Sequence, residues 1–220
     1  MRRFDLTLLD MNALLDLYGS RREEIRKRVD EFRSNMESSG ERIFAELCFC
    51  ICTPQSRATI CWKAISTLME NGLLYTGLEV EIAPFLIGIR FSKKKAGCIV
   101  GARRFFTKDG ILGLKERLKA STDIFELREW LVSNVNGLGM KEASHFLRNM
   151  GLGLNLAILD RHILRNLKRL GVIREIPASL NKSRYEKTES MMKSLAEEVG
   201  IPMADLDLLL WSFETGMIFK

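Results

Sequence analysis

The sequence predicts an all-α fold, and three observations support this prediction. Apolar residues recur at steps of three and four along most of the 220 residues, which is the spacing of one face of a helix. No segment alternates between apolar and polar residues as a half-buried β-strand does. A hydrophobic content of 46% is enough to build a core in a chain of this length. We therefore expect packed helices and no sheet.

Residues that cap or break helices divide the first half of the chain. Ser20 and Glu23 have the spacing of a capping box, which predicts that a charged helix begins there and runs towards Met36. Thr53-Pro54 should end a second helix, because the residue before a proline disfavours the helical conformation. Asn71-Gly72 should end a third. Helical elements are expected over residues 20–36, 41–52, 56–71, 78–87, 93–106 and 111–118.

Three successive helices are predicted later in the chain. Asp123 can supply the N-cap of the first and Asp160 that of the third. Gly151 and Gly171 suit the ends of the second and third, because glycine readily adopts the left-handed conformation of a helix C-cap. These helices are expected over about residues 124–134, 140–150 and 161–170. The first two are joined by only a few residues, so they form a tight helical hairpin.

The balance of charges favours a polyanionic partner. The chain has 34 lysine and arginine residues against 28 aspartate and glutamate residues, a net charge of +6. Basic residues on solvated helix faces are the alternative explanation. No window reaches the roughly 18 apolar residues of a membrane span, and the start of the sequence lacks the features of a secretion signal. We therefore expect a cytoplasmic protein without a membrane partner.

The cysteines do not have the pattern of a metal site. They are Cys48, Cys50, Cys52, Cys61 and Cys98, an odd number that suits reduced thiols. Cys48 lies on an apolar stripe with Phe44, Leu47 and Ile51, so we expect a buried core thiol there. No C-x-x-C pair is present and only two histidines are available. Neither a zinc site nor an iron–sulfur cluster is expected.

The hairpin sequence Gly137-Leu138-Gly139 is a candidate phosphate-binding element. Two glycines allow a sharp turn, and the next helix then begins with N–H groups that have no partner within the helix. Such a helix start binds a phosphate without reading DNA sequence. The alternative is a connection that needs glycine for geometry alone, and these three residues taken by themselves favour it.

Lys141 and Asp160 are candidates for a catalytic pair. Lys141 is expected in the first turn of a helix, where its charge opposes the helix dipole and the neutral, nucleophilic amine is favoured. A carboxylate such as Asp160 can take the amine proton and stabilise positive charge on a reacting sugar. Each residue alone has an ordinary explanation, as a surface lysine and as a helix cap. Their joint occurrence favours catalysis.

These residues resemble the signature of the helix-hairpin-helix DNA glycosylase superfamily, which is a G-x-G-x-K hairpin followed by D-x-H. Here the hairpin is Val135-Asn-Gly-Leu-Gly-Met-Lys141, and Leu159-Asp-Arg-His162 follows. Thr53-Pro-Gln-Ser56 is similar to the superfamily loop that carries a DNA-inserting residue. The segment from Phe91 to Ala96 and the tail from Trp211 to Lys220 resemble the archaeal-type 8-oxoguanine DNA glycosylase/AP lyase, the second family for that lesion.

The resemblance implies a two-lobed, all-α fold with the active site in the cleft between the lobes. One lobe would comprise residues 1–36 and 152–220, and the other, a central bundle, residues 37–151. The implied activity is that of a bifunctional DNA glycosylase/AP lyase of base excision repair, which removes 8-oxoguanine from double-stranded DNA. The chain would be a monomer, associated with the nucleoid through DNA.

The resemblance also implies roles for individual residues. Lys141 would attack C1′ of a flipped nucleotide and form a Schiff base that leads to β-elimination, with Asp160 assisting the first step. The residues implied at the DNA are Gly137, Gly139, His162 and Gln55. Within this group, His162 would contact phosphate and Gln55 would fill the gap left by the flipped base.

Base recognition and a cation complete the implied site. Phe91 and Trp211 are candidates for stacking on the base, although both are also candidates for the core. Lys220, after the apolar run 217–219, would contribute to recognition if the tail docks. Backbone carbonyls of Ser133, Val135 and Leu138 would hold a sodium or potassium ion. No other cofactor is expected.

Two alternatives remain open from the sequence. A pyrimidine-lesion glycosylase of the endonuclease III type shares the lysine and the aspartate, but the cluster cysteines of that type are missing here and its tail differs. Hairpins of this kind also serve as non-catalytic DNA-binding modules in helicase and ligase subunits, where neither Lys141 nor Asp160 is required. Borohydride trapping and a panel of damaged bases separate these three readings.

Overall fold

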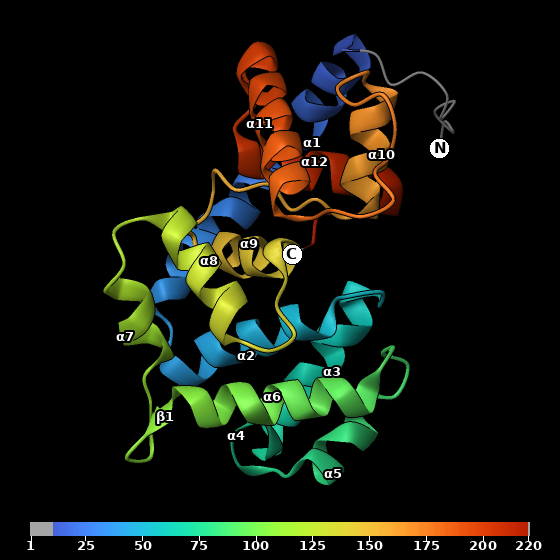
Figure 1. Ribbon diagram of the computed structural model, residues 1–220. Helices are drawn as coiled ribbons and strands as arrows, with labels where there is room; N and C mark the ends of the chain where they lie inside the picture. The colour runs from blue at the N-terminus through green and yellow to red at the C-terminus, as the bar shows by residue number, and fades with distance from the viewer. Residues whose placement is uncertain (1–10, 220) are drawn as a thin grey trace. The chain divides into compact units, whose positions relative to one another are not determined.

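The computed structural model describes residues 11–219 and divides them into two units. Unit 1 comprises the described residues up to Phe32 together with those from Leu154 onward, and unit 2 is Arg33–Gly153. Both units are built from helices, as Figure 1 shows, which confirms the all-α class. None of the helices within residues 11–219 has both the length and the apolar character needed to cross a membrane.

Unit 2 is organised around α2 (Gly40–Cys52), in which every residue from Ile43 to Cys52 is buried. α3 (Ala58–Glu70), α6 (Ser92–Phe106) and α9 (Met140–Asn149) all pack against α2, and Figure 1 shows α2 lying between α9 and α6. A helix that is apolar on all sides has to be enclosed by others. The remaining elements are η1 (Asn35–Glu37), α4 (Leu73–Thr76), α5 (Glu79–Ile82), η2 (Ala83–Leu86), β1 (Thr107–Lys108), β2 (Ile111–Leu112), α7 (Leu114–Lys119) and α8 (Ile124–Asn134).

Unit 1 is organised around α12 (Met203–Thr215), whose residues from Met203 to Leu210 are all buried. α10 (Arg161–Arg169) and α11 (Lys182–Val199) pack against α12. α1 (Met11–Ser34) is tied to the same helix, because Tyr18 Oη donates a 2.7 Å hydrogen bond to the carboxylate of Asp205. The guanidinium of Arg21 donates to the carbonyl of Gly216, just after α12 ends.

Two local predictions were wrong. Ser20 lies inside α1 rather than at its start, and its hydroxyl donates to the carbonyl of Leu17 at 2.8 Å. A helical serine can satisfy its hydroxyl in this way, so the capping-box spacing with Glu23 did not mark a helix start. The second error concerns residues 107–112, which form a small antiparallel hairpin, β1 and β2. Asp109-Gly110, both at positive φ, make its two-residue turn, and this Asp-Gly pair was the available sequence signal. The strands have only two residues each, which is too short for alternation to reveal them.

The three later helices have the predicted caps, and their boundaries agree with the prediction to within one residue. Asp123 accepts hydrogen bonds from the N–H groups of Phe125 and Glu126 at the start of α8. Gly151 and Gly171 follow α9 and α10 at positive φ, as predicted for C-caps. The tight connection between α8 and α9 is therefore the expected helical hairpin.

Candidate active site

Lys141 lies in the first turn of α9, as predicted. Its Nζ donates a hydrogen bond to Thr53 Oγ1 at 3.1 Å and lies 3.7 Å from the Glu142 carboxylate. The side chain is 19% exposed, so the amine is held by neighbours but can still be reached. Thr53 is the residue directly after α2 and is buried. Unit 2 therefore presents an amine whose position is fixed by the end of its central helix.

The start of α9 uses part of its hydrogen-bonding capacity internally. The Glu142 carboxylate accepts from the N–H of Gly139 at 3.1 Å, and the Leu138 N–H donates to the carbonyl of Val135. The first helical bond of α9 runs from Ala143 to Gly139. A phosphate at this helix start would therefore meet the N–H groups of residues 140–142. These residues follow directly after Gly137 and Gly139, which the sequence suggested as the contacts.

Gly137 is required at its position for two reasons. Its φ is +94°, a conformation that side chains rarely adopt. A Cβ atom there would also lie 3.1 Å from Cys98 Sγ and 3.3 Å from Ile51 Cγ2. The hairpin thus packs its backbone against α2 and α6, and the geometric explanation for this glycine holds whether or not DNA binds.

Gln55 and Phe91 share an unusual conformation. Both are non-glycine residues at positive φ, +54° and +60°, and both are exposed, with 55% of Phe91 accessible. Phe91 caps α6, and the guanidinium of Arg90 lies 4.9 Å from the centre of its ring. Strained backbone of this kind costs about 1–3 kcal/mol per residue and concentrates at functional sites. The exposure of Phe91 argues against a core role, while stacking on a base stays a prediction.

Asp160 is the N-cap of α10 in unit 1, as predicted. One carboxylate oxygen, Oδ1, accepts from the N–H groups of His162 at 2.7 Å and Ile163 at 2.9 Å. Because both cap bonds end on Oδ1, the second oxygen is not needed for capping. The structural and the catalytic explanations of Asp160 are therefore compatible.

The segment that leads to Asp160 is held by α11. Tyr185 Oη donates to the carbonyl of Ala157 at 2.7 Å and accepts from the N–H of Leu159. The Glu189 carboxylate accepts from the N–H of Ala157 at 2.8 Å. These side chains satisfy buried backbone groups that no helix or strand pairs. They fix the position of Asp160, and sequence reasoning did not identify them because they lie far along the chain.

His162 has a carboxylate neighbour that the sequence did not reveal. Its Nδ1 lies 3.7 Å from Glu214 of α12, which also pairs with Arg165 at 3.8 Å and with Arg169 at closer range. Glu214 is only 11% exposed. The sequence signal for such a carboxylate was the cluster of basic residues on α10. Their mutual repulsion is offset by a poorly exposed carboxylate placed among them.

Trp211 and the tail belong to the same unit. Trp211 is half-buried, with its ring stacked on Phe219 at 6.4 Å and edge-on to His162. Ile218 is buried, so the tail is docked over the described residues, whereas Met217 is exposed. Lys220 lies outside the described residues. The role of Trp211 in base recognition stays a prediction.

Four of the five thiols lie in the core of unit 2, and Cys98 is half-buried. Cys48, Cys50, Cys52 and Cys61 are buried, which confirms the expectation for Cys48. Burial raises the pKa of Cys61 to about 11 and raises that of Cys52 further. Across residues 11–219, no group of three or more histidine, cysteine, aspartate or glutamate residues is placed to bind a metal ion.

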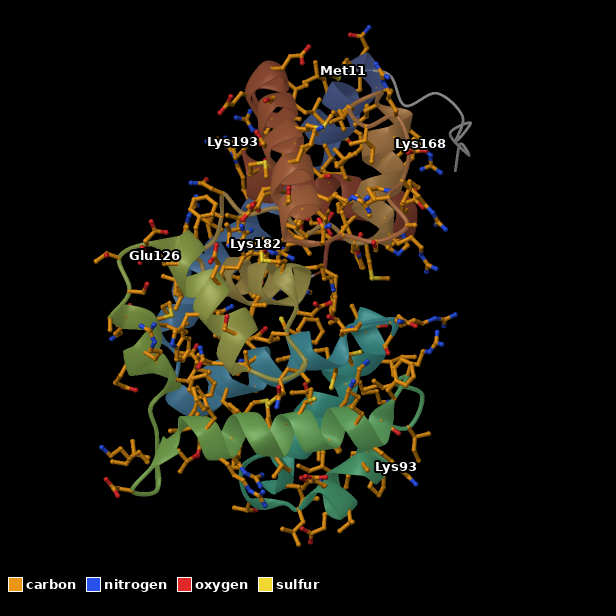
Figure 2. All side chains as sticks on the ribbon, viewed as in Figure 1. Met11, Lys93, Glu126, Lys168, Lys182 and Lys193 are labelled. Carbon is orange, nitrogen blue, oxygen red and sulfur yellow. The ribbon has the colours of Figure 1, made fainter. Side chains whose placement is uncertain are left out.

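Each unit thus gathers its own predicted residues. Unit 2 carries Lys141, the hairpin, Gln55 and Phe91, whereas unit 1 carries Asp160 together with its neighbours on α10 and α12. Figure 2 shows all placed side chains on the ribbon.

Comparisons with known proteins give a consistent result. A family profile described as 8-oxoguanine DNA glycosylase matches residues 25–201. The 8-oxoguanine DNA glycosylase/AP lyase of Fusobacterium nucleatum is 43% identical over 95% of this chain and 97% of its own length. The Methanocaldococcus jannaschii 8-oxoguanine glycosylase/lyase, solved with a 15mer DNA containing 8-oxoguanine, superposes with a TM-score of 0.87. It is 36% identical, over 96% of this chain and 99% of that one. The Thermotoga maritima 8-oxoguanine DNA glycosylase gives a TM-score of 0.85 at 36% identity, over 96% and 98% of the two chains.

Replacing Gly137 with alanine should destabilise the protein more than the same change at Gly171. Both glycines have positive φ, but a Cβ at Gly171 meets no atom within 4 Å, whereas one at Gly137 would lie 3.1 Å from Cys98 and 3.3 Å from Ile51, closer than ordinary contact. We expect Gly171→Ala to show backbone strain alone, roughly 1–3 kcal/mol, and Gly137→Ala to lose more, in urea unfolding. Equal losses would mean that the hairpin does not pack as described.

Proposed function

The chain belongs to the family of 8-oxoguanine DNA glycosylases, and we propose from this premise that it excises 8-oxoguanine from double-stranded DNA and then cleaves the strand as an AP lyase. The observation that carries the residue assignment is the amine of Lys141, reachable at the start of α9 and held by Thr53. A protein that acts on chromosomal DNA would be associated with the nucleoid.

Lys141 is the proposed nucleophile. Its neutral amine attacks C1′ of the damaged nucleotide, the bond from C1′ to the base nitrogen breaks, and the base leaves with a proton. Loss of the amine proton and opening of the sugar give a Schiff base. Removal of a C2′ proton then expels the 3′ phosphate by β-elimination, and water releases the lysine. The hydrogen bond to Thr53 and the nearby Glu142 carboxylate orient Nζ before attack.

Asp160 is the proposed acidic partner. With Oδ1 engaged by the cap of α10, the other oxygen can accept the amine proton or stabilise positive charge on the sugar. The cap fixes the side-chain rotamer, so the second oxygen has a defined direction. A carboxylate fixed in this way loses little freedom when the substrate binds.

DNA binding is proposed to rest on many weak contacts. The net charge of +6 favours the phosphate backbone, and the start of α9 offers N–H groups to one phosphate. The Nδ1 of His162 faces Glu214, so Nε2 is the nitrogen that could donate to a phosphate. Gln55 is exposed on a turn, as an inserting residue needs to be.

The first test combines a substrate panel with Lys141→Gln. We expect the wild-type protein to excise 8-oxoguanine and to be trapped on DNA by borohydride, and the variant to lose both activities. DNA binding should persist in the variant, because its contacts are spread over many groups. Lys119→Gln, an exposed lysine on α7, is the matched control. Excision of oxidised pyrimidines alone would indicate the endonuclease III type, and binding without any trapping would indicate a non-catalytic module.

The second test replaces Asp160 with asparagine. Asparagine caps helices as well as aspartate does, so we expect little change in the free energy of unfolding but loss of most excision activity. Asp123→Asn is the matched control, because Asp123 also caps a helix through two N–H groups. It should keep both stability and activity. A variant at Asp160 that unfolds while the control does not would show that this residue is structural.

A monovalent cation is proposed at the end of α8. Ser133 lies in the last turn, where carbonyl groups project beyond the helical hydrogen bonds and carry the negative end of the dipole. The carbonyl of Val135 accepts from Leu138 N–H and retains a second lone pair. Together with the carbonyl of Leu138, these oxygens have the chemistry that sodium and potassium prefer.

Exchanging the salt tests this cation. Replacing sodium and potassium with tetramethylammonium at constant ionic strength leaves the counterion contribution to DNA binding in place. We expect duplex affinity to fall in this buffer and to return when potassium is added. An unchanged affinity would contradict the proposal.

A further inference from the structure

Lys95 of α6 is a buried ammonium surrounded by oxygen atoms. Only 6% of the surface of this residue is exposed to solvent. Nζ donates to the carbonyl of Cys52 at 2.7 Å, to that of Pro54 at 2.8 Å and to Ser56 Oγ at 3.2 Å. A charged lysine has three N–H donors, so these three acceptors match its full capacity.

Such a group is costly to keep in a protein interior. Burial lowers the pKa of Lys95 from its ordinary value, and the charge of Lys141 acts in the same direction. The three oxygens oppose this effect, because they bind the charged form best. Shape alone would be served by an apolar side chain of similar length. The ammonium therefore supplies something that packing does not.

Two of the three oxygens that Lys95 binds belong to the turn that carries Gln55, and the third, the carbonyl of Cys52, lies at the end of α2 directly before it. This turn follows α2, and its Ser56 N–H donates to the carbonyl of Thr53 at 3.1 Å. Gln55, between two of the Lys95 contacts, has a φ of +54°. Pro54 has no N–H of its own with which to support the turn. The hydroxyl of Ser56 also donates to the carbonyl of Pro54 at 3.3 Å, and Lys95 adds three charge-assisted hydrogen bonds to the few that the turn makes internally.

The same network reaches Phe91 and Lys141. Ser56 Oγ also accepts from the N–H of Arg90, at 3.0 Å, directly before Phe91 with its φ of +60°. Thr53 Oγ1 donates to the carbonyl of Cys50 at 2.9 Å, so its lone pairs are left to face Lys141 Nζ at 3.1 Å. Within residues 11–219, three non-glycine residues have positive φ, and the two outside the β1–β2 turn both adjoin this network.

We propose that Lys95 is a positioning residue for base excision, an internal cation that presets the Thr53–Ser56 turn and, through it, Gln55, Phe91 and the amine of Lys141. This inference rests on the proposed function. Lys95 does not touch the substrate, since its Nζ is enclosed by the three oxygens. Its contribution is to hold the backbone in a strained conformation before DNA arrives, so that binding energy is not needed to create it.

The test compares Lys95→Met with Lys93→Met in single-turnover excision of 8-oxoguanine. Lys93 is an exposed lysine on the same helix, labelled in Figure 2, and its loss removes the same charge. We expect Lys95→Met to slow excision on the order of 100-fold, the cost of misplacing reacting groups by about 1 Å. Affinity for an uncleaved duplex should change by less than about threefold, because phosphate contacts dominate it. Lys93→Met should excise at close to the wild-type rate.

A destabilising control separates positioning from general stability. Ile99→Val creates a small cavity at another buried residue of α6, whose apolar side chain makes no hydrogen bond to the three oxygens. All variants are assayed at a temperature at which circular dichroism shows them folded. If excision falls equally in Ile99→Val and Lys95→Met, Lys95 is only structural and the inference is wrong.

Ser56→Ala provides a second, milder variant. It removes one of the three acceptors of Lys95 and the acceptor of the Arg90 N–H, and it leaves the ammonium of Lys95 in place. We expect a loss of excision on the order of tenfold, and this variant decides the matter if Lys95→Met does not fold. Normal excision by Ser56→Ala and Lys95→Met beside an active wild type would overturn this inference alone. An inactive wild type would overturn the proposed function as well.

Discussion

The arrangement of unit 2 depends on one constraint, which is that its central helix ends inside the protein. The last carbonyl groups of a helix have no partner within it and need donors from elsewhere when they are buried. At the end of α2, the carbonyl of Cys52 accepts from Lys95 and from the thiol of Cys61, and that of Cys50 accepts from Thr53. Two of these donors, Lys95 and Thr53, also hold the turn beside Lys141. The same hydrogen bonds therefore stabilise the helix end and position the candidate site.

In unit 1, the corresponding feature is the N-terminal end of a helix, α10. Asp160 satisfies the first N–H groups of α10 with one oxygen, and the cap leaves the other oxygen unused. Glu214 of α12 pairs with three basic side chains of α10, His162, Arg165 and Arg169, and offsets their mutual repulsion. Helix termini are regions where backbone groups and side chains meet at fixed distances. Both candidate catalytic residues lie at such termini.

Local signals in the sequence predicted much of the site, and long-range contacts account for what they missed. Asp123, Asp160 and the hairpin glycines act within a few residues, so their roles follow from spacing. Lys95 binds oxygens about forty positions earlier in the chain, and no pattern in α6 distinguishes it from the exposed Lys93. The positive φ of Gln55 was equally hidden, because glutamine does not favour this conformation and nothing near it in the sequence calls for it.

The buried thiols of unit 2 have a further consequence for an enzyme that repairs oxidised DNA. The thiolate is the form that reacts with peroxides, and access to solvent governs how fast it does so. With a pKa of about 11, Cys61 is ionised in roughly one molecule in ten thousand at neutral pH. Its neighbours on α2, Cys48, Cys50 and Cys52, are buried just as completely. These four thiols are therefore shielded from the same oxidising conditions that generate the substrate.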